Sequence, residues 1–127
     1  VEVFLEVKMF RFSLLPREQR TKQNLSIYSW YVENLLNRIV VLPSGEVTIQ
    51  ERGNPSGQIS TTTDNNMVNT FLQAFEFAYL RPTIEIEVLK ENWQDYDTLI
   101  YGDDRLTRMP DLPTNYIDRV IKMYKEI

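Results

Sequence analysis

The sequence has no cysteine and no histidine among its 127 residues. Without cysteine it has no disulfide bond and no thiolate metal site. Without histidine it has no Ser-His-Asp triad, no Cys-His dyad and no zinc-hydrolase site of the usual kind. Any acid–base or metal chemistry must therefore come from Asp, Glu, Lys or Tyr side chains.

Positive charge is also scarce, with 14 Lys and Arg against 18 Asp and Glu and a net charge of −4. A free-standing nucleic-acid-binding protein normally carries a basic face, so the charge balance disfavours that class. No apolar run reaches membrane-spanning length, and no signal peptide opens the chain. The length allows one domain at most, and Val1 in place of Met suggests an internal piece or a processed chain.

Hydrophobic spacing predicts a chain of mixed helices and strands. Helices are predicted over residues 1–15, 21–38 and 61–79 and from Ile117 to the end, where Ile117, Val120, Ile121 and Tyr124 form the apolar face. Two β-branched runs, 39–42 and 47–50, flank a Pro-Ser-Gly turn and predict a hairpin. Residues 84–93 fit either a strand or a short helix.

The tetrapeptide Tyr101-Gly102-Asp103-Asp104 follows a short apolar run and predicts a second hairpin, whose tight turn carries two carboxylates. Two exposed acids at such a tip suit a hard divalent cation such as Mg²⁺, which takes oxygen ligands and often brings phosphates with it. A solvated turn is the alternative, and for the tetrapeptide alone it is the more common explanation.

A Gly- and Pro-rich loop, residues 53–57, precedes the helix predicted over 61–79. The sequence Thr61-Thr62-Thr63-Asp64 fits a capping box, in which Thr61 caps the helix and Asp64 reaches back. The apolar stripe of this helix is predicted to consist of Met67, Phe71, Ala74, Phe75 and Ala78. Thr61, Asn65 and Asn69 are four residues apart and share a polar face, either for binding or simply as a cap and exposed amides.

Together, the two stretches resemble a known pair of motifs. The pattern Ser56-Gly57-x3-Thr61-x3-Asn65 with a downstream Tyr-Gly-Asp-Asp resembles motifs B and C of viral RNA-dependent RNA polymerases. The stretch from Arg52 to Leu80 looks most like the astrovirus members, and the resemblance extends over essentially the whole chain. It implies an α+β fold, namely part of a polymerase palm-type antiparallel sheet with packed helices. Residues 1–127 would then be a fragment of a single catalytic domain, the palm with part of the fingers.

The resemblance also implies roles for single residues. It implies that Asp103 and Asp104 are catalytic and hold Mg²⁺, or Mn²⁺ in its place, for two-metal addition of ribonucleotides. It implies that Ser56 and Gly57 lie in a mobile loop that handles template and incoming nucleotide. Thr61 and Asn65 are expected to help recognise the ribose 2′-hydroxyl, since an amide both donates to and accepts from a hydroxyl.

The implied partners are an RNA template and primer, ribonucleoside triphosphates and the missing fingers and thumb of the same polymerase. The implied location is the host cytoplasm, at membrane-associated replication sites. The motif A aspartates, expected ahead of the first helix, are absent, and so are the triphosphate-gripping basic motif and the motif D lysine. We therefore expect this chain alone to be inactive. Two alternatives stay open: a reverse transcriptase-like palm and a non-catalytic, palm-like interaction module.

Overall fold

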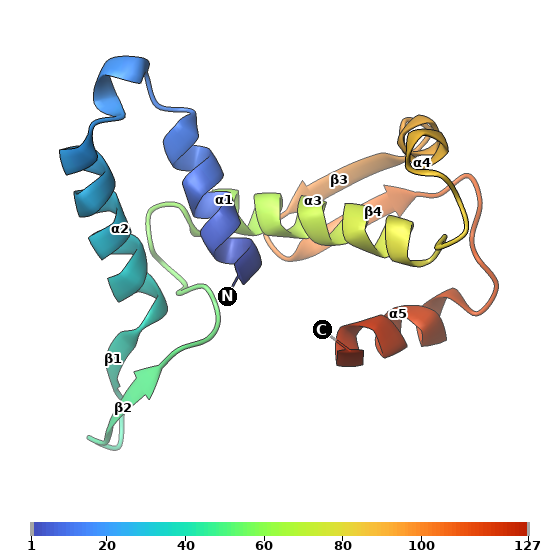
Figure 1. Ribbon diagram of the computed structural model, residues 1–127. Helices are drawn as coiled ribbons and strands as arrows, with labels where there is room; N and C mark the ends of the chain where they lie inside the picture. Colours follow the sequence, from blue (N-terminus) through green and yellow to red (C-terminus); the bar gives the residue numbers. More distant parts are fainter. Residues whose placement is uncertain (1, 127) are drawn as a thin grey trace. The chain divides into compact units, whose positions relative to one another are not determined.

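The computed structural model describes residues 2–126 and contains both helices and antiparallel strands, which confirms the predicted α+β class (Figure 1). The elements in chain order are α1 (Glu2–Ser13), η1 (Arg17–Gln19), α2 (Lys22–Leu36), β1 (Arg38–Val41), β2 (Val47–Gln50), α3 (Thr61–Tyr79), α4 (Ile86–Trp93), β3 (Asp97–Tyr101), β4 (Asp104–Arg108) and α5 (Tyr116–Glu126). The strands form two separate hairpins, β1–β2 and β3–β4. The chain divides into two compact units, the first ending at Asp64 and the second beginning at Asn65.

The first unit is built on the helix pair α1 and α2, which lie side by side (Figure 1). Helix α2 begins after Thr21, whose hydroxyl accepts a hydrogen bond of 3.1 Å from the backbone N–H of Asn24. The apolar core of this unit consists of the buried side chains Val7, Phe12, Val32 and Leu35. The ring of Tyr28 packs against Phe12 at a centroid distance of 5.3 Å.

The predicted hairpin after α2 is confirmed, with Ile39 opposite Ile49 and Val41 opposite Val47. These four side chains are exposed. In the sequence, Ile39 continues the three-and-four spacing of Val32 and Leu35, which predicts that it joins the buried face of α2; this prediction is wrong. The helix ends at Leu36, and a strand turns alternate residues to opposite faces, so the helical spacing no longer applies to Ile39.

The second unit is built on the C-terminal part of α3, against which the β3–β4 hairpin and α5 pack. Residues 84–93, which the sequence left open between a strand and a short helix, are helical: helix α4 begins at Ile86, after two loop residues. A small aromatic core joins α3 to the end of α4 and the segment after it: Phe77 contacts Trp93 and Tyr96 at centroid distances of 5.2 and 4.8 Å. The Arg81 guanidinium covers the Phe77 ring and donates to the hydroxyl of Tyr96 at 2.8 Å.

Helix α3 has the predicted bounds but not the predicted buried face. Its buried residues beyond Asp64 are Gln73, Glu76 and Phe77, whereas Phe71 of the expected apolar stripe is 49% exposed. Polar side chains are buried here because the second unit supplies partners for them: Gln73 donates to the Thr107 hydroxyl at 2.7 Å.

The expected apolar face of α5 is also wrong in part. Ile117 and Ile121 are exposed, while Met123 is fully buried and Tyr116 is half-buried. The second unit thus uses a face of α5 that combines an apolar and an aromatic side chain. Among residues 2–126, none of the helices is both long enough and apolar enough to cross a lipid bilayer.

Candidate functional site

The acidic tetrapeptide lies at the tip of the β3–β4 hairpin. Tyr101 pairs with Asp104 in the antiparallel ladder, so Gly102 and Asp103 are the two central turn residues. Gly102 has φ +66°, while the φ of Asp103 is negative, which is the pattern of a type II′ turn. The predicted glycine-dependent turn is confirmed, but only Asp103 lies inside it. Asp104 is the first residue of β4.

The two carboxylates are exposed and lie on different sides of the hairpin tip. Along β4 burial alternates, so that Asp104 is on the exposed face with Leu106, whereas Arg105 is on the covered face. Asp103 instead lines a cavity of the second unit. Within residues 2–126, neither carboxylate takes part in an ion pair or a side-chain hydrogen bond, so both are open to a ligand.

Two amides of α3 hold the backbone of this turn. The side-chain oxygen of Asn66 accepts a hydrogen bond from the backbone N–H of Gly102 at 2.5 Å. The Asn69 amide donates to the carbonyl of Asp103 at 3.0 Å. Both residues therefore fix the turn through its main chain and leave the acidic side chains free. Asn69 belongs to the polar face seen in the sequence, but Asn66 was not predicted, because no local pattern shows which loop will lie beside it.

The cavity beside the turn has a volume of about 400 Å³. Its polar lining comes from three elements of the second unit. These are α3 with Asn65, Asn69 and Glu76, the β3–β4 hairpin with Asp103 and Arg105, and α5 with Tyr124. The structure therefore brings Asn65 and Asp103, two of the predicted site residues, to one cavity. The cavity lining contains hydrogen-bond acceptors, hydrogen-bond donors and one free carboxylate, which suits a polar, charged ligand.

Glu76 is the centre of the polar core under this cavity. Its carboxylate accepts hydrogen bonds from the Tyr124 hydroxyl at 2.6 Å and from the Tyr116 hydroxyl at 3.2 Å, and it forms an ion pair with Arg105. Burial and the neighbouring Glu76 carboxylate raise the pKa values of both tyrosines above the ordinary value. Glu76 thereby links α3, β4 and α5, and the sequence held no signal for it.

The loop before α3 belongs to the first unit and carries the other predicted residues. Ser56 and Gly57 are exposed, and Gly57 has φ +83°, a conformation that favours glycine. The Thr61 hydroxyl donates to the carbonyl of Pro55 at 2.7 Å and lies 3.0 Å from that of Gln58. Thr61 therefore ties the loop to the helix.

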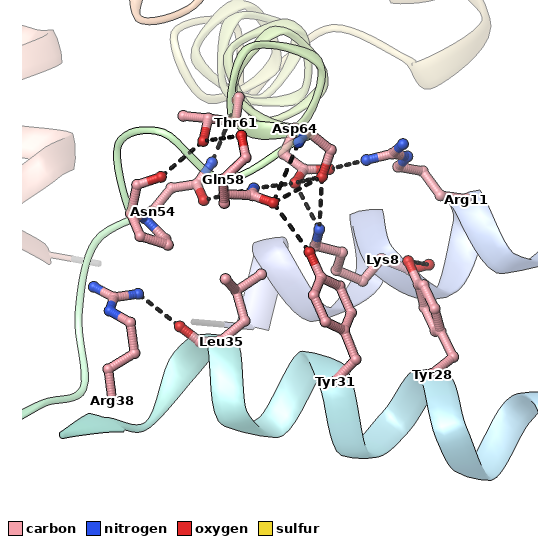
Figure 2. Close-up of polar contacts among 12 residues, drawn as sticks. Lys8, Arg11, Tyr28, Tyr31, Leu35, Arg38, Asn54, Gln58, Thr61 and Asp64 are labelled. Atoms are coloured by element: carbon pink, nitrogen blue, oxygen red, sulfur yellow. Dashed lines mark hydrogen bonds and ion pairs between the residues drawn. The ribbon is translucent and has the colours of Figure 1, made fainter.

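The predicted capping box is wrong. The backbone N–H of Asp64 donates to the carbonyl of Ser60, and the Asp64 carboxylate turns to other side chains. It accepts from Lys8 at 2.6 Å, from Ser60 at 2.8 Å, from Gln58 at 2.9 Å and also from Arg11, as Figure 2 shows. The two cations lie on α1, more than fifty residues upstream. A capping pattern looks only at four consecutive residues and misses such partners.

Asp64 and Lys8 form a buried ion pair, with the two side chains 0% and 1% exposed. Burial by itself would raise the pKa of Asp64. Hydrogen bonds from Lys8, Gln58, Ser60 and Arg11 outweigh burial and hold the pKa below its ordinary value. We call Lys8, Arg11, Gln58, Ser60 and Asp64 the Asp64 cluster.

The donor set at the hairpin tip is compatible with Mg²⁺. This ion prefers oxygen ligands and in enzymes is commonly held by one or two carboxylates, with waters and substrate phosphates completing its shell. Asp103 and Asp104 offer that number of carboxylates, one on each side of the tip. Among residues 2–126, no three acidic side chains come together, so the hairpin tip by itself is not an all-protein cage.

The mixed helix-and-hairpin fold and the acidic turn point to a polymerase palm, and comparison with known proteins agrees. A family model described as "Viral RNA-dependent RNA polymerase" matches residues 2–127. The chain therefore belongs to the viral RNA-dependent RNA polymerase family.

The particular relatives are astroviral. The chain is 56% identical to the non-structural polyprotein 1AB of Ovine astrovirus 1 over 126 residues, which is 99% of this chain and 9% of the relative. It is 54% identical over 125 residues to that of Human astrovirus-5 and 41% identical over 128 residues to that of Turkey astrovirus 2, in both cases covering 98% of this chain and 8% of the relative. The chain thus spans about a tenth of these polyproteins. No solved structure matches it.

Proposed function

We propose that this chain is the part of an RNA-directed RNA polymerase that supplies motif B and motif C, and that the intact enzyme adds ribonucleotides to an RNA 3′ end. The observation that carries this proposal is the free carboxylate of Asp103 on a turn held by Asn66 and Asn69. A reacting group at such a place needs a fixed backbone and an unoccupied side chain. The family membership supplies the reaction class.

In this proposal, Asp103 and Asp104 hold Mg²⁺, or Mn²⁺ in its place. When bound, the ion supplies charge stabilisation to the attacking and leaving oxygens of phosphoryl transfer. Asn66 and Asn69 keep the turn in register with α3, so that Asp103 stays at the edge of the cavity. Asn65, which lines the same cavity, contacts the ribose of the nucleotide in this proposal.

Ser56 and Gly57 form the loop that meets the template and the incoming nucleotide, and Thr61 anchors this loop through the carbonyl of Pro55. Direct recognition of the ribose 2′-hydroxyl by Thr61 is also part of the proposal, since a hydroxyl that donates to a carbonyl can still accept a hydrogen bond. These contacts set which nucleotide is bound, while Asp103 acts in the chemical step.

We further propose that both units belong to one catalytic domain, the palm with part of the fingers, and that the chain alone adds no nucleotide. Within the described residues, 2–126, Asp103 and Asp104 do not converge with a third acid, and two such carboxylates are a poor cage for two metal ions. The partners are an RNA template and primer, ribonucleoside triphosphates and the other parts of the polymerase. The reaction takes place in the host cytoplasm at membrane-associated replication sites.

The test is primer extension with the intact polymerase that contains this chain. Asp103→Asn is expected to lower nucleotide addition by about 10³-fold or more, since metal-based charge stabilisation is worth several kcal/mol. Asp97→Asn is the matched control, because Asp97 is an exposed aspartate at the other end of the same hairpin. Full activity of Asp103→Asn, with Asp97→Asn also active, would refute the catalytic role and favour a non-catalytic interaction module.

A further inference from the structure

Two side chains of the loop from Gly53 to Ser60 reach Asp64. The Gln58 amide nitrogen donates to Asp64 at 2.9 Å and to the side-chain oxygen of Asn54 at 3.1 Å. The Gln58 oxygen accepts from the Tyr31 hydroxyl at 3.0 Å and from the backbone N–H of Ser60 at 3.3 Å. Gln58 is therefore bonded on both sides of its amide, which fixes the middle of the loop.

Ser60 adds a second link to the same carboxylate. Its hydroxyl lies 2.8 Å from the Oδ2 atom of Asp64, the atom that also accepts from Lys8 and Gln58. Arg11 binds the other oxygen, Oδ1. Both oxygens of a completely buried carboxylate are thus occupied, and the loop is tied to a charged acceptor, which forms stronger hydrogen bonds than a neutral one (Figure 2).

The residue between the two links faces the solvent. The Ile59 side chain is fully exposed, although Gln58 and Ser60 on either side of it are half-buried. At Gly57 an added Cβ would meet nothing within 4 Å, so the tip of the loop is also open. The cluster therefore fixes the base of the loop and leaves Gly57 and Ile59 accessible to a ligand.

We propose that Asp64 is a positioning residue: through Gln58 and Ser60 it holds the loop in the conformation that binds the incoming ribonucleotide, and Lys8 and Arg11 hold Asp64. This inference rests on the proposed function, because the loop is assigned there to nucleotide and template. Fixing the backbone of each loop residue in advance removes an entropy cost that binding would otherwise have to meet.

This proposal predicts that loosening the loop changes the KM for ribonucleotides but not kcat. Loosening the loop weakens nucleotide binding, whereas Asp103 and its turn belong to the second unit and keep their own anchors, Asn66 and Asn69. A change that weakens binding in the ground state and the transition state alike raises KM and leaves kcat unchanged.

The experiment uses the intact polymerase with the double variant Gln58→Met and Ser60→Ala. These changes cut the loop from Asp64 but leave its ion pairs with Lys8 and Arg11 in place. Tyr28→Phe is the matched control, because it removes one hydrogen bond to the Lys8 carbonyl in the same unit without touching the loop. Steady-state primer extension gives KM for ribonucleotides and kcat, and hydrogen exchange of a peptide covering residues 53–60 reports the loop directly.

The double variant is expected to raise the KM for ribonucleotides about tenfold, which corresponds to 1.36 kcal/mol of lost binding free energy, and to keep kcat within about twofold. Loop exchange is expected to accelerate. In Tyr28→Phe, the KM and the exchange of the loop stay at the wild-type value. If the double variant does not fold, Ser60→Ala alone is expected to raise the KM about threefold, as the loss of one link.

An unchanged KM together with faster loop exchange overturns the inference, and so does an equal fall of kcat in the double variant and in Tyr28→Phe. Failure of the proposed function is recognised separately. In that case Asp103→Asn remains as active as the wild type, or the wild-type polymerase makes no RNA product.

Discussion

The buried ion pair between Lys8 and Asp64 predicts an unequal cost of removing its two members. Asp64→Asn removes the only carboxylate that faces Lys8 within residues 2–126, and the ammonium is 1% exposed. The Lys8 ammonium keeps the Ser60 hydroxyl at 3.2 Å and the ring faces of Phe4 and Tyr31, whose centroids are 5.1 and 5.4 Å away. Those contacts do not neutralise a buried charge, so we expect a loss of about 3–5 kcal/mol, the usual cost of breaking a buried pair.

Lys8→Met should cost less, because Asp64 keeps the Arg11 guanidinium and the hydrogen bonds from Gln58 and Ser60. We expect a loss of about 1–3 kcal/mol, that of one hydrogen bond to a charged group. The double variant removes both members and no longer contains an unpaired ammonium. It is therefore expected to be more stable than Asp64→Asn alone, with a coupling free energy of about 2 kcal/mol.

Hydrogen exchange of peptides covering α1 in the intact polymerase measures these costs as local opening free energies. A loss of 3–5 kcal/mol corresponds to exchange about 10²- to 10⁴-fold faster. Because the folded-state pKa of Asp64 is depressed, its contribution is present above about pH 4, the ordinary pKa, and is lost as the pH falls through the folded-state pKa. Equal costs for the two single variants, or additive effects in the double variant, would refute the reasoning.

Three further predictions concern the second unit. Glu76→Gln is expected to destabilise it by about 1–3 kcal/mol, because the buried carboxylate loses its ion pair with Arg105, and hydrogen exchange of α5 is the measurement. Above about pH 10 the stability of α5 is expected to fall, because tyrosine ionises more readily in the unfolded chain than in the fold. Tyr124→Phe should weaken this alkaline dependence, and an unchanged dependence would contradict the assignment to Glu76 and Tyr124. Gly102→Ala is expected to cost the hairpin about 1–2 kcal/mol through its positive φ alone, since an added Cβ would meet no neighbour, and exchange in β3 and β4 checks it.

Local features of this protein followed from the sequence. The bounds of α3, 61–79, were predicted as they are found, because an uninterrupted helical stretch between a Gly- and Pro-rich loop and Arg81-Pro82 is a short-range signal. The turn at Gly102 was predicted for the same reason, since a hairpin of this length needs a residue that tolerates positive φ. The motif pattern also led to the polymerase family, which the comparisons confirm.

The faces of the helices were decided by tertiary structure. Helix α3 buries Gln73 and Glu76 and exposes Phe71, against the hydrophobic pattern, because Thr107 and Arg105 of the hairpin lie opposite the two polar side chains. Periodicity measures how apolar a face is. It contains no information about whether a buried polar group will find a partner.

Asp64 shows the same limit most clearly. The residues next to Asp64 in the sequence predict that it is part of a capping box. In the structure it is instead the buried acceptor that joins α1 to the loop before α3. The difference lies in Lys8 and Arg11, more than fifty residues away in sequence, whose cations make burial of the carboxylate favourable. The sequence by itself determined most of the helices, where the chain turns and to which family it belongs, but not whether residues 84–93 are helical. Only the tertiary structure decided which charges meet, because that depends on the distance between side chains in space.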